Sequence, residues 1–461
     1  MSAIEAEADV VSVEAFGYKQ ELKRSLSLFD LLVYGLIFIS PTAPIVVFGI
    51  VYNASKGMVP LVYVIGLVAM VFTAWSYMAM SRAFPVAGSV YAYAGRSIGA
   101  FAGFIAGWAM LLDYLLLPTL TFVVCAIAMN TMIPGIPGWA WVVGLLAFAT
   151  VINYLGIEVT ARINAVLLVL QLIVLAAFVG AGVWAVMRHA GGASFTIAPF
   201  YNPAALTPSL IFSALSLAVL SFLGFDAIST MSEESKHGAG AVGRATILSL
   251  CLSAALFVLQ TYIAALFGLG KTSFAPGEQT DAAFYNIAAL IGGAPLKFIV
   301  AVPGIMFGAI AGSLVAQAST ARLMFSMARD GKLPRFLAHV HPERKVPENA
   351  IFLVAAITLV LGIGLVDKLE LLTSMVSFGA LLGFLLLHIS VAMHFVVREK
   401  SRDWLRYLVS PIIGFAIIAY VLWNAEANAK IAGLCWLAVG CAVYAMLKLL
   451  HKEPQAGSLP P

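Results

Sequence analysis

Long runs of hydrophobic residues, separated by short polar stretches, dominate this chain from residue 27 onward. A helix that crosses the hydrocarbon core of a bilayer needs about 20 such residues. Twelve runs come close to or exceed this length, and each predicts a membrane-spanning helix. The runs cover residues 27–52, 58–80, 99–130, 137–155, 163–187, 208–230, 245–269, 296–325, 349–366, 371–396, 407–424 and 431–450. The pattern predicts an all-α integral membrane protein with twelve transmembrane helices.

The composition agrees with a bilayer as the solvent. Hydrophobic residues make up 62% of the chain and charged residues 10%. A soluble domain is roughly 45–50% apolar and about 25% charged. So few charges cannot cover so much apolar surface in water, so a soluble enzyme is excluded.

The two ends of the chain are polar, and the charge pattern indicates which side of the membrane they occupy. Residues 1–26 lack the short apolar core and cleavage site of a secretory signal. With twelve spans, most of the 26 Lys and Arg fall on the side of the N-terminus, in particular in 322–345 and 398–406. Positively charged loops face the cytoplasm. We therefore expect 1–26 and 451–461 to be cytoplasmic tails.

The first span contains two prolines near its middle. Each proline removes a backbone donor and crowds the preceding turn, so a continuous helix is not expected here. Irregular backbone at membrane depth is tolerated only inside the protein or beside a cavity. A simple kink without function is the alternative. The residues at this predicted break are Ser40, Pro41, Thr42, Ala43 and Pro44.

The sixth span carries a second predicted break, five spans after the first. Its residues are Leu220, Ser221, Phe222, Leu223 and Gly224, and Asp226 follows them. Discontinuous helices at corresponding positions are typical of transporters built from inverted repeats. We expect repeats at 27–187 and 208–396, with 407–450 forming two additional helices.

Broken helices provide groups that bind small charged solutes. The half-helix N-terminus favours a carboxylate, and free carbonyl groups favour an ammonium. A zwitterionic amino acid is matched at both ends, and an organic cation is matched by the carbonyls and a nearby acid. The pattern therefore predicts substrate binding between the two breaks.

Two acidic residues lie deep in predicted spans, where an ionisable group is costly and usually functional. Asp113 is near the middle of the third span, and its alternative role is a polar tie between helices. Asp226 is the better candidate for proton coupling, although it could simply cap the broken helix. Glu233 and Glu234 are expected at the membrane interface.

Other chemistry finds little support in the sequence. The stretch ending in Gly270, Lys271 and Thr272 resembles a phosphate loop, but it ends a membrane helix and lacks the preceding strand. No cofactor, metal site or nucleic-acid partner is predicted. An intramembrane enzyme would need paired catalytic groups, and a channel would need a continuous polar pore. Neither pattern is found.

Several motifs resemble the amino acid–polyamine–organocation permeases, and most closely their bacterial putrescine-importer branch. They cover most of the chain and include Phe84-Pro85 with Ala87-Gly88-Ser89, Gly107-Trp108 with Leu111 to Leu115, Ser221 to Ala227, Ser232-Glu233-Glu234, Ala321-Arg322-Leu323, and Arg329-Asp330-Gly331. The resemblance implies a fold of five plus five inverted helices with two extra, alternating access, and a bacterial inner membrane. It also implies that residues 40–44 and 220–224 line the site with Tyr114, and that Asp226 serves proton coupling.

Two positions depart from the family pattern. Putrescine importers carry an acid in the second half of the first helix, where this chain has Val46. Many amino acid members carry a lysine in the fifth helix, where this chain has Gln171, as the importers do. The first departure weakens the case for a dication. The sequence thus favours a proton-coupled amino acid importer, with a putrescine or polyamine importer and an amino acid exchanger as alternatives.

Overall fold

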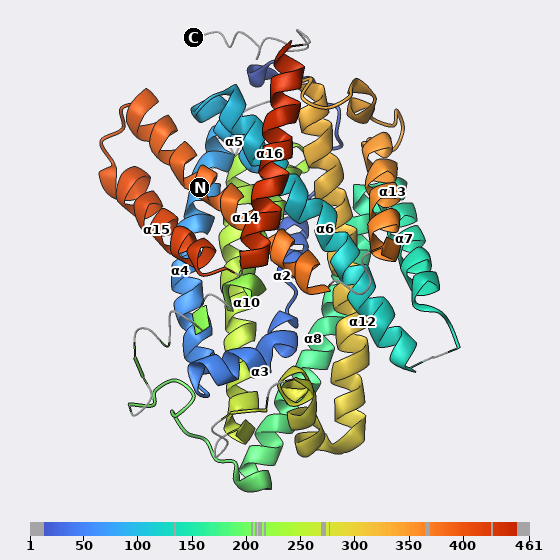
Figure 1. The fold of residues 1–461 in the computed structure, drawn as a ribbon, viewed down its shortest axis with the longest axis vertical. Helices are drawn as coiled ribbons and strands as arrows, with labels where there is room; N and C mark the ends of the chain where they lie inside the picture. Colours follow the sequence, from blue (N-terminus) through green and yellow to red (C-terminus); the bar gives the residue numbers. More distant parts are fainter. Residues whose placement is uncertain are drawn as a thin grey trace, which may run out of the picture.

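The computed structural model describes residues 13–132, 135–203, 206–207, 210, 214–215, 218–268, 273–275, 277–364, 369–425 and 427–449. Regular structure in these ranges is helical apart from one isolated bridge (Figure 1). The α-helices are α2 (Leu28–Ile39), α3 (Ala43–Ser55), α4 (Val59–Ala83), α5 (Ser89–Ser97), α6 (Ala100–Met132), α7 (Gly138–Leu155), α8 (Ile157–Met187), α10 (Gly238–Gly268), α11 (Glu278–Asp281), α12 (Ala283–Arg329), α13 (Glu348–Gly364), α14 (Leu369–Val391), α15 (Ser410–Trp423) and α16 (Ala427–Leu449). The 3₁₀ turns are η1 (Val13–Phe16), η2 (Ala190–Gly192), η3 (Val219–Phe222), η4 (Phe225–Glu234) and η5 (Arg335–Ala338), and two π-helical turns are η6 (Ala392–Arg398) and η7 (Leu405–Val409).

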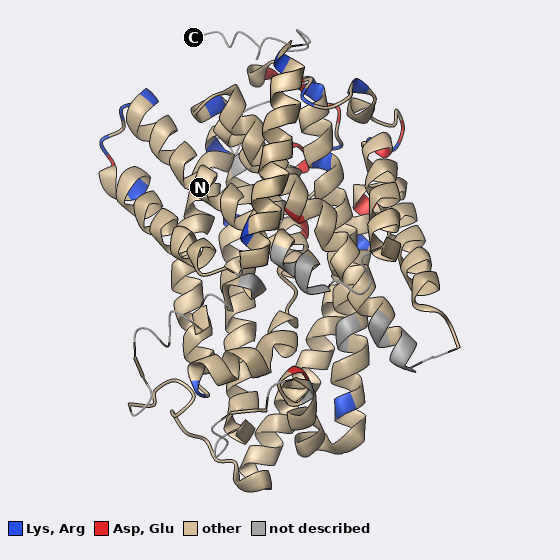
Figure 2. Cartoon of the chain, in the orientation of Figure 1, with Lys and Arg blue, Asp and Glu red and all other residues tan. Residues whose placement is uncertain are grey.

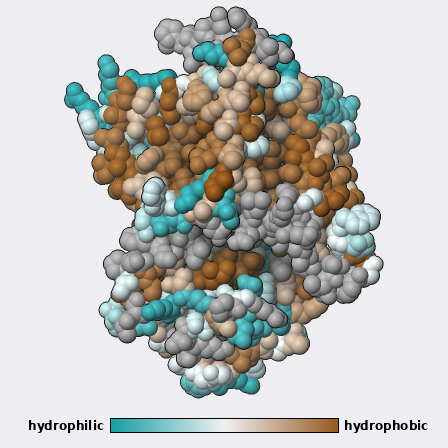
Figure 3. Space-filling model, in the orientation of Figure 1, coloured by the Kyte–Doolittle hydropathy of each residue, from teal (hydrophilic) through white to brown (hydrophobic). Residues whose placement is uncertain are grey.

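Among the described residues, nine helices are long and apolar enough to cross a membrane, and α2 with α3 form a tenth span bent by 44°. Helix α13 is apolar but shorter. The predicted span at 208–230 is described only in part, because residues 208, 209, 211–213, 216 and 217 lie outside the described ranges. Hydrophobic side chains cover much of the flank around α14, α15 and α16 (Figure 3). The chain is a multi-pass helical membrane protein.

Helix α2 begins and ends where its local sequence dictates. Ser27 and Asp30 form a capping box, in which the Ser27 N–H donates to Asp30 Oδ2 at 2.8 Å. The helix ends at Ser40, whose φ of 64° is outside the helical region and which precedes Pro41. Helix α3 then starts at Ala43, with Pro44 in its first turn, where a missing N–H does no harm. The predicted break of the first span is confirmed.

Helix α6 lies at the centre of the packing, between α12 and α14, and α4 and α2 pack against α10. Helix α16 is joined to α6 by two stacked tryptophans. Each indole N–H donates to the other residue's carbonyl, from Trp108 to Trp436 at 2.8 Å and in return at 2.7 Å. The elements that flank the two breaks, α2 and η4, pack on each other and on α10 and α12.

Several helices, among them α8 and α12, begin earlier than hydropathy predicts. Helix α8 starts at Ile157 and not at 163. Gly156, whose φ is 123°, separates it from the end of α7 at Leu155. Its first turns carry the charged residues Glu158, which pairs with Lys23 at 2.9 Å, and Arg162, so only the later turns form a continuous apolar run. Helix α12 extends the predicted 296–325 span back to Ala283 across a kink at Gly292 and Gly293.

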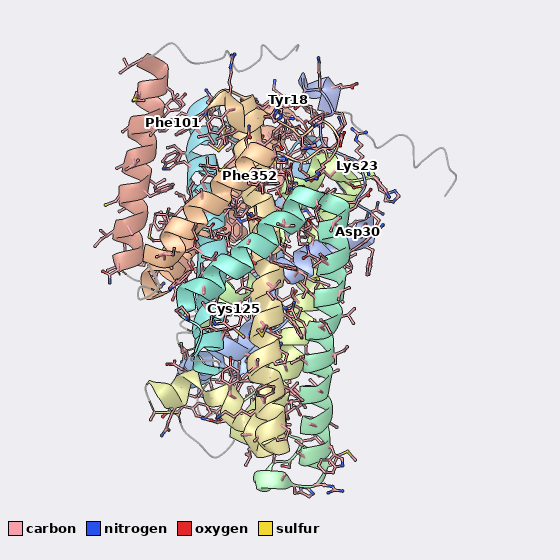
Figure 4. The ribbon with its side chains drawn as sticks, turned by 90° about the vertical axis from the view of Figure 1, so that its right-hand side faces the viewer. Tyr18, Lys23, Asp30, Phe101, Cys125 and Phe352 are labelled. Atoms are coloured by element: carbon pink, nitrogen blue, oxygen red, sulfur yellow. The ribbon has the colours of Figure 1, made fainter. Side chains whose placement is uncertain are left out.

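We call the end of the molecule that carries η1 and the last turn of α16 the terminal face. Figure 2 shows Lys and Arg concentrated at this end. The N-terminal segment descends from it into α2, as the positions of Tyr18, Lys23 and Asp30 show in Figure 4. Helix α3 and the start of α12 lie toward the opposite face (Figure 1). The charge asymmetry is the one expected of an oriented membrane protein.

Candidate substrate site

A cavity of about 340 Å³ lies at the break between α2 and α3. Its size is within the range of small-molecule sites, about 300–1,000 Å³. Of the predicted site residues, its lining includes Ser40, Thr42, Ala43, Asp113, Leu223 and Gly224. Val46, Tyr285 and Val300 extend the cavity toward the opposite face. The two breaks and one deep acid therefore share a single cavity.

The two breaks touch through their backbones. Gly224 has φ 120°, and a Cβ built on it lies 2.8 Å from the carbonyl carbon of Phe38 and 3.0 Å from the Ile39 nitrogen. Any side chain at this position is strained by the backbone conformation and clashes with main-chain atoms that cannot rotate away. Glycine is required here because α2 ends directly against the turn between η3 and η4.

We expect Gly224→Ala to destabilise the protein by several kcal/mol and to abolish transport, because it combines a forbidden φ with a backbone clash (about 1–3 kcal/mol for each such strain). The matched control is Gly180→Ala in α8, where nothing lies within 4 Å of the added carbon. That change should stabilise the helix by up to about 1 kcal/mol. Thermal unfolding in detergent measures both, and equal unfolding temperatures contradict the prediction.

One carbonyl freed by the first break has a side-chain partner. The Gln260 amide of α10 donates to the Pro41 carbonyl at 2.8 Å, and Gln260 is fully buried. The Ser40 and Thr42 hydroxyls lie 3.2 Å apart at the cavity wall. A buried carbonyl without a donor is costly. The Gln260 side chain therefore stabilises the non-helical backbone at Pro41. Sequence reasoning missed this residue, since a single glutamine in an apolar span carries no motif.

Asp226 directly follows the second break and is buried. Its Oδ1 accepts a hydrogen bond from the Gly224 N–H at 3.2 Å, and its Oδ2 accepts one from the Tyr114 hydroxyl at 2.5 Å. The first bond is the capping role that the sequence offered as an alternative. The second bond joins α6 to the break. Asp226 is therefore coupled to the conformation of both elements.

Asp113 is the neighbour of Tyr114 on α6, and its side chain lines the cavity while being only 3% exposed. A Cβ added at Gly379 of α14 would lie 3.3 Å from its Cβ, so the backbones of α6 and α14 approach closely there. The position of Asp113 is therefore fixed beside the cavity, at the contact between α6 and α14.

The other predicted site residues lie behind the cavity wall. Pro41, Pro44 and Tyr114 are buried and do not line the cavity. The Ser221 hydroxyl lies 3.0 Å from that of Tyr63, and Phe222 packs on Tyr63. The side chain of Leu220 lies outside the described residues.

Gln171 is placed beside the first break, behind Gly308 of α12. A Cβ built on Gly308 lies 3.9 Å from Gln171 Oε1 and 3.4 Å from both the Ser40 and Thr42 hydroxyls. Gln171 is fully buried, and among the described residues neither polar atom of its amide has a hydrogen-bond partner. Gln171, on α8, thus lies beside the break without lining the cavity.

Toward the terminal face, two buried ion pairs close the bundle. Glu234 accepts from Arg322 through both carboxylate oxygens, with Nη2 at 2.7 Å from Oε1. Glu233 accepts from Arg329 at 2.7 and 3.1 Å and from the Ala87 N–H at 2.8 Å. Both acids are at most 1% exposed, so they are buried inside the protein, and their expected depth at the membrane interface stays a prediction. Arginines from α12 compensate their charge, and the linear sequence does not show that pairing.

The N-terminal segment lies over these pairs. The Ser25 and Leu26 N–H groups donate to the Glu234 carbonyl at 3.0 and 2.9 Å. The Tyr18 hydroxyl donates to Asp330 at 2.8 Å, with the Arg329 guanidinium over its ring. Burial, and then the charge of Asp330, raise the pKa of Tyr18 to about 12, so the phenol keeps its proton. We call the two ion pairs and residues 13–26 the terminal closure.

A helical membrane bundle with a solute-sized cavity where two interrupted helices meet is typical of a secondary transporter. The related proteins are named as importers, permeases or transporters. The low-affinity putrescine importer PlaP of Escherichia coli K12 is 34% identical over 444 residues, covering 94% of this chain and 96% of the importer. The branched-chain amino acid permease BcaP of Bacillus subtilis is 28% identical, covering 96% of each chain. The methylthioribose transporter of the same organism is 26% identical, covering 98% and 99%.

The amino acid permease family model matches residues 31–447, which is most of the chain. The chain belongs to this family. It is therefore a permease and not an enzyme, and its partners are small-molecule substrates. The resemblance stated from the sequence motifs is confirmed.

Proposed function

We propose that this protein imports an amino acid or a related amine together with protons, by alternating access at the cavity between the two breaks. The observation that carries the proposal is one carboxylate, Asp113, in a mostly aliphatic cavity next to the first turn of α3. The terminal closure shuts the cavity from the face that we assign to the cytoplasm. A substrate therefore enters from the opposite face and leaves when the closure opens.

The lining favours a zwitterion with an aliphatic side chain. Asp113 is positioned for an ammonium group. The positive end of the α3 helix dipole, whose first N–H groups are bonded within the turn, favours a carboxylate by its charge. The remaining wall is largely aliphatic, including Ile37, Ile45, Leu117, Leu120, Val124, Leu223 and Val376. An apolar wall of this kind accepts a hydrocarbon side chain.

A putrescine importer is the second candidate, because of the similarity to PlaP. A diamine places two positive charges in the cavity, and Asp113 is the one acidic side chain among the described lining residues. Val46 occupies the position where importers carry an acid, and it lines the cavity. Burying the second ammonium without a partner is costly, so the amino acid is preferred.

Proton coupling rests on the Asp226 carboxyl. Asp226 joins α6 to the second break, and a proton on it changes the hydrogen bonds that hold these elements together. We also propose that 27–187 and 208–396 are inverted repeats, because each opens with an interrupted helix and the interruptions meet.

The test is uptake by purified protein in liposomes. Under an inward proton gradient, we expect accumulation of an aliphatic amino acid such as leucine, and collapse of that accumulation when a protonophore is added. Accumulation of labelled putrescine is measured in parallel vesicles, and it distinguishes a putrescine importer from an amino acid importer. Downhill flux of leucine that does not respond to the protonophore contradicts proton coupling, and no flux of either solute contradicts the proposed function.

We expect Asp113→Asn to weaken substrate affinity about 10- to 100-fold, the loss of one hydrogen bond to a charged group (about 1.5–3 kcal/mol). Thermal-shift titration with amino acids and diamines measures this in detergent. The matched control is Thr121→Ala, which removes a neutral side chain from the cavity lining. Equal affinity in Asp113→Asn and wild type contradicts the role of Asp113 in holding an ammonium.

A further inference from the structure

A second cavity, of about 310 Å³, lies at the terminal face, away from the substrate site. The last turns of α4 form one wall, and the π-helical turns η6 and η7 form the other. Phe395 and Tyr407 stack at 4.1 Å across these two turns. π-helical turns are rare in proteins, and where they occur they often lie at functional sites. Here two of them follow one another where the chain passes from α14 to α15.

Two arginines border this cavity. Arg406 lies over the Trp75 ring at 5.5 Å, and its Nε is 3.7 Å from Asp403, a weak and exposed pairing. Arg82 is exposed, and among the described residues no carboxylate lies within ion-pair distance of it. The acid of the lining, Glu399, lies 3.1 Å from His394. The guanidinium groups are thus available to an anion.

The surroundings place the cavity at the level of lipid head groups. The segment 398–406 holds four Lys or Arg against two acids, and its basic residues are visible at the turn between α14 and α15 (Figure 2). Trp404 is 58% exposed and Leu405 is 75% exposed beside it. Tryptophan and arginine next to exposed apolar side chains are typical of the membrane interface.

We propose that this cavity binds the head group of an anionic phospholipid. Arg82 and Arg406 bind the phosphodiester, and Trp75 packs against the glycerol region. Guanidinium groups suit phosphate because their donors are arranged in a planar fork. The acyl chains extend along α4 and α15 into the bilayer. Bound lipid then ties α4 to the ends of α14 and α15.

Native mass spectrometry of the full chain tests the proposal, with phosphatidylglycerol against phosphatidylcholine of the same chains. We expect phosphatidylglycerol adducts to persist at concentrations at least about tenfold lower, a difference of about 1.4 kcal/mol. Arg82→Gln with Arg406→Gln should remove this preference. Arg82→Lys should retain part of it, because the charge remains.

The matched control is Arg188→Gln, which removes another exposed arginine over a tryptophan, Trp184 at 3.9 Å, from the end of α8. This variant should keep the preference. The proposal is overturned if the Arg82 and Arg406 double variant binds phosphatidylglycerol as the wild type does. It is also overturned if inorganic phosphate displaces the lipid at equal concentration, since the site then binds a free anion. If the double variant does not fold, the single variant Arg82→Gln is measured in its place, and the proposal is overturned if this variant binds phosphatidylglycerol as the wild type does.

Discussion

Liposomes containing Asp226→Asn should no longer accumulate substrate under an inward proton gradient, although they should still exchange labelled for unlabelled substrate. Asparagine retains an oxygen that can accept from the Gly224 N–H or the Tyr114 hydroxyl, so the local shape persists. It cannot bind or release a proton, so the coupling is lost. A co-transported proton can drive about a fiftyfold gradient of a neutral solute per 100 mV. In the variant that gradient should fall to about one.

Tyr114→Phe is the matched control, because it removes the hydroxyl donor and leaves the carboxyl group in place. Its uptake should still depend on external pH and increase as that pH falls. Initial rates between about pH 5 and pH 8 separate the two variants. Unchanged pH dependence in Asp226→Asn contradicts a proton-carrying role for this residue and leaves only its role as a helix cap.

Arg322→Met should cause the largest loss of stability among the charge variants. It leaves the Glu234 carboxylate buried without its bidentate partner, a situation that costs about 3–5 kcal/mol. The Arg322 Nη1 bond to the Ala318 carbonyl, at 3.0 Å, is lost as well. The double variant Glu234→Gln, Arg322→Met should recover most of the loss, because no charge then remains uncompensated.

Lys23→Ala provides the comparison, since the Lys23–Glu158 pair is about half exposed on both sides. A pair in water contributes about 0–1 kcal/mol. Thermal unfolding in detergent should therefore place Lys23→Ala near the wild type and Arg322→Met well below it. Equal unfolding temperatures for these two variants contradict the structural importance of the buried Arg322–Glu234 pair.

The helices and their breaks were open to prediction from the sequence. In lipid, every backbone polar group must be satisfied within the chain, so a long apolar run has to be helical. Pro41 and Pro44 lie within one turn of each other, and this local property favours a break after Ser40, where α2 ends. The starts of α8 and α12 were less predictable from the sequence. The first turns of α8 contain charged residues, and α12 contains a kink at two glycines, so both starts lie outside the apolar runs.

The pairing of side chains was decided by tertiary structure. Asp113 and Asp226 could be named as deep acids because buried charge is costly at any position in a span. The sequence did not determine that Tyr114 donates to Asp226, that Gln260 caps the Pro41 carbonyl, or that Arg322 and Arg329 neutralise Glu234 and Glu233. Each of these contacts joins residues at least 88 positions apart. Such contacts depend on which helix faces pack together, and hydropathy, a property of each span alone, does not specify that packing.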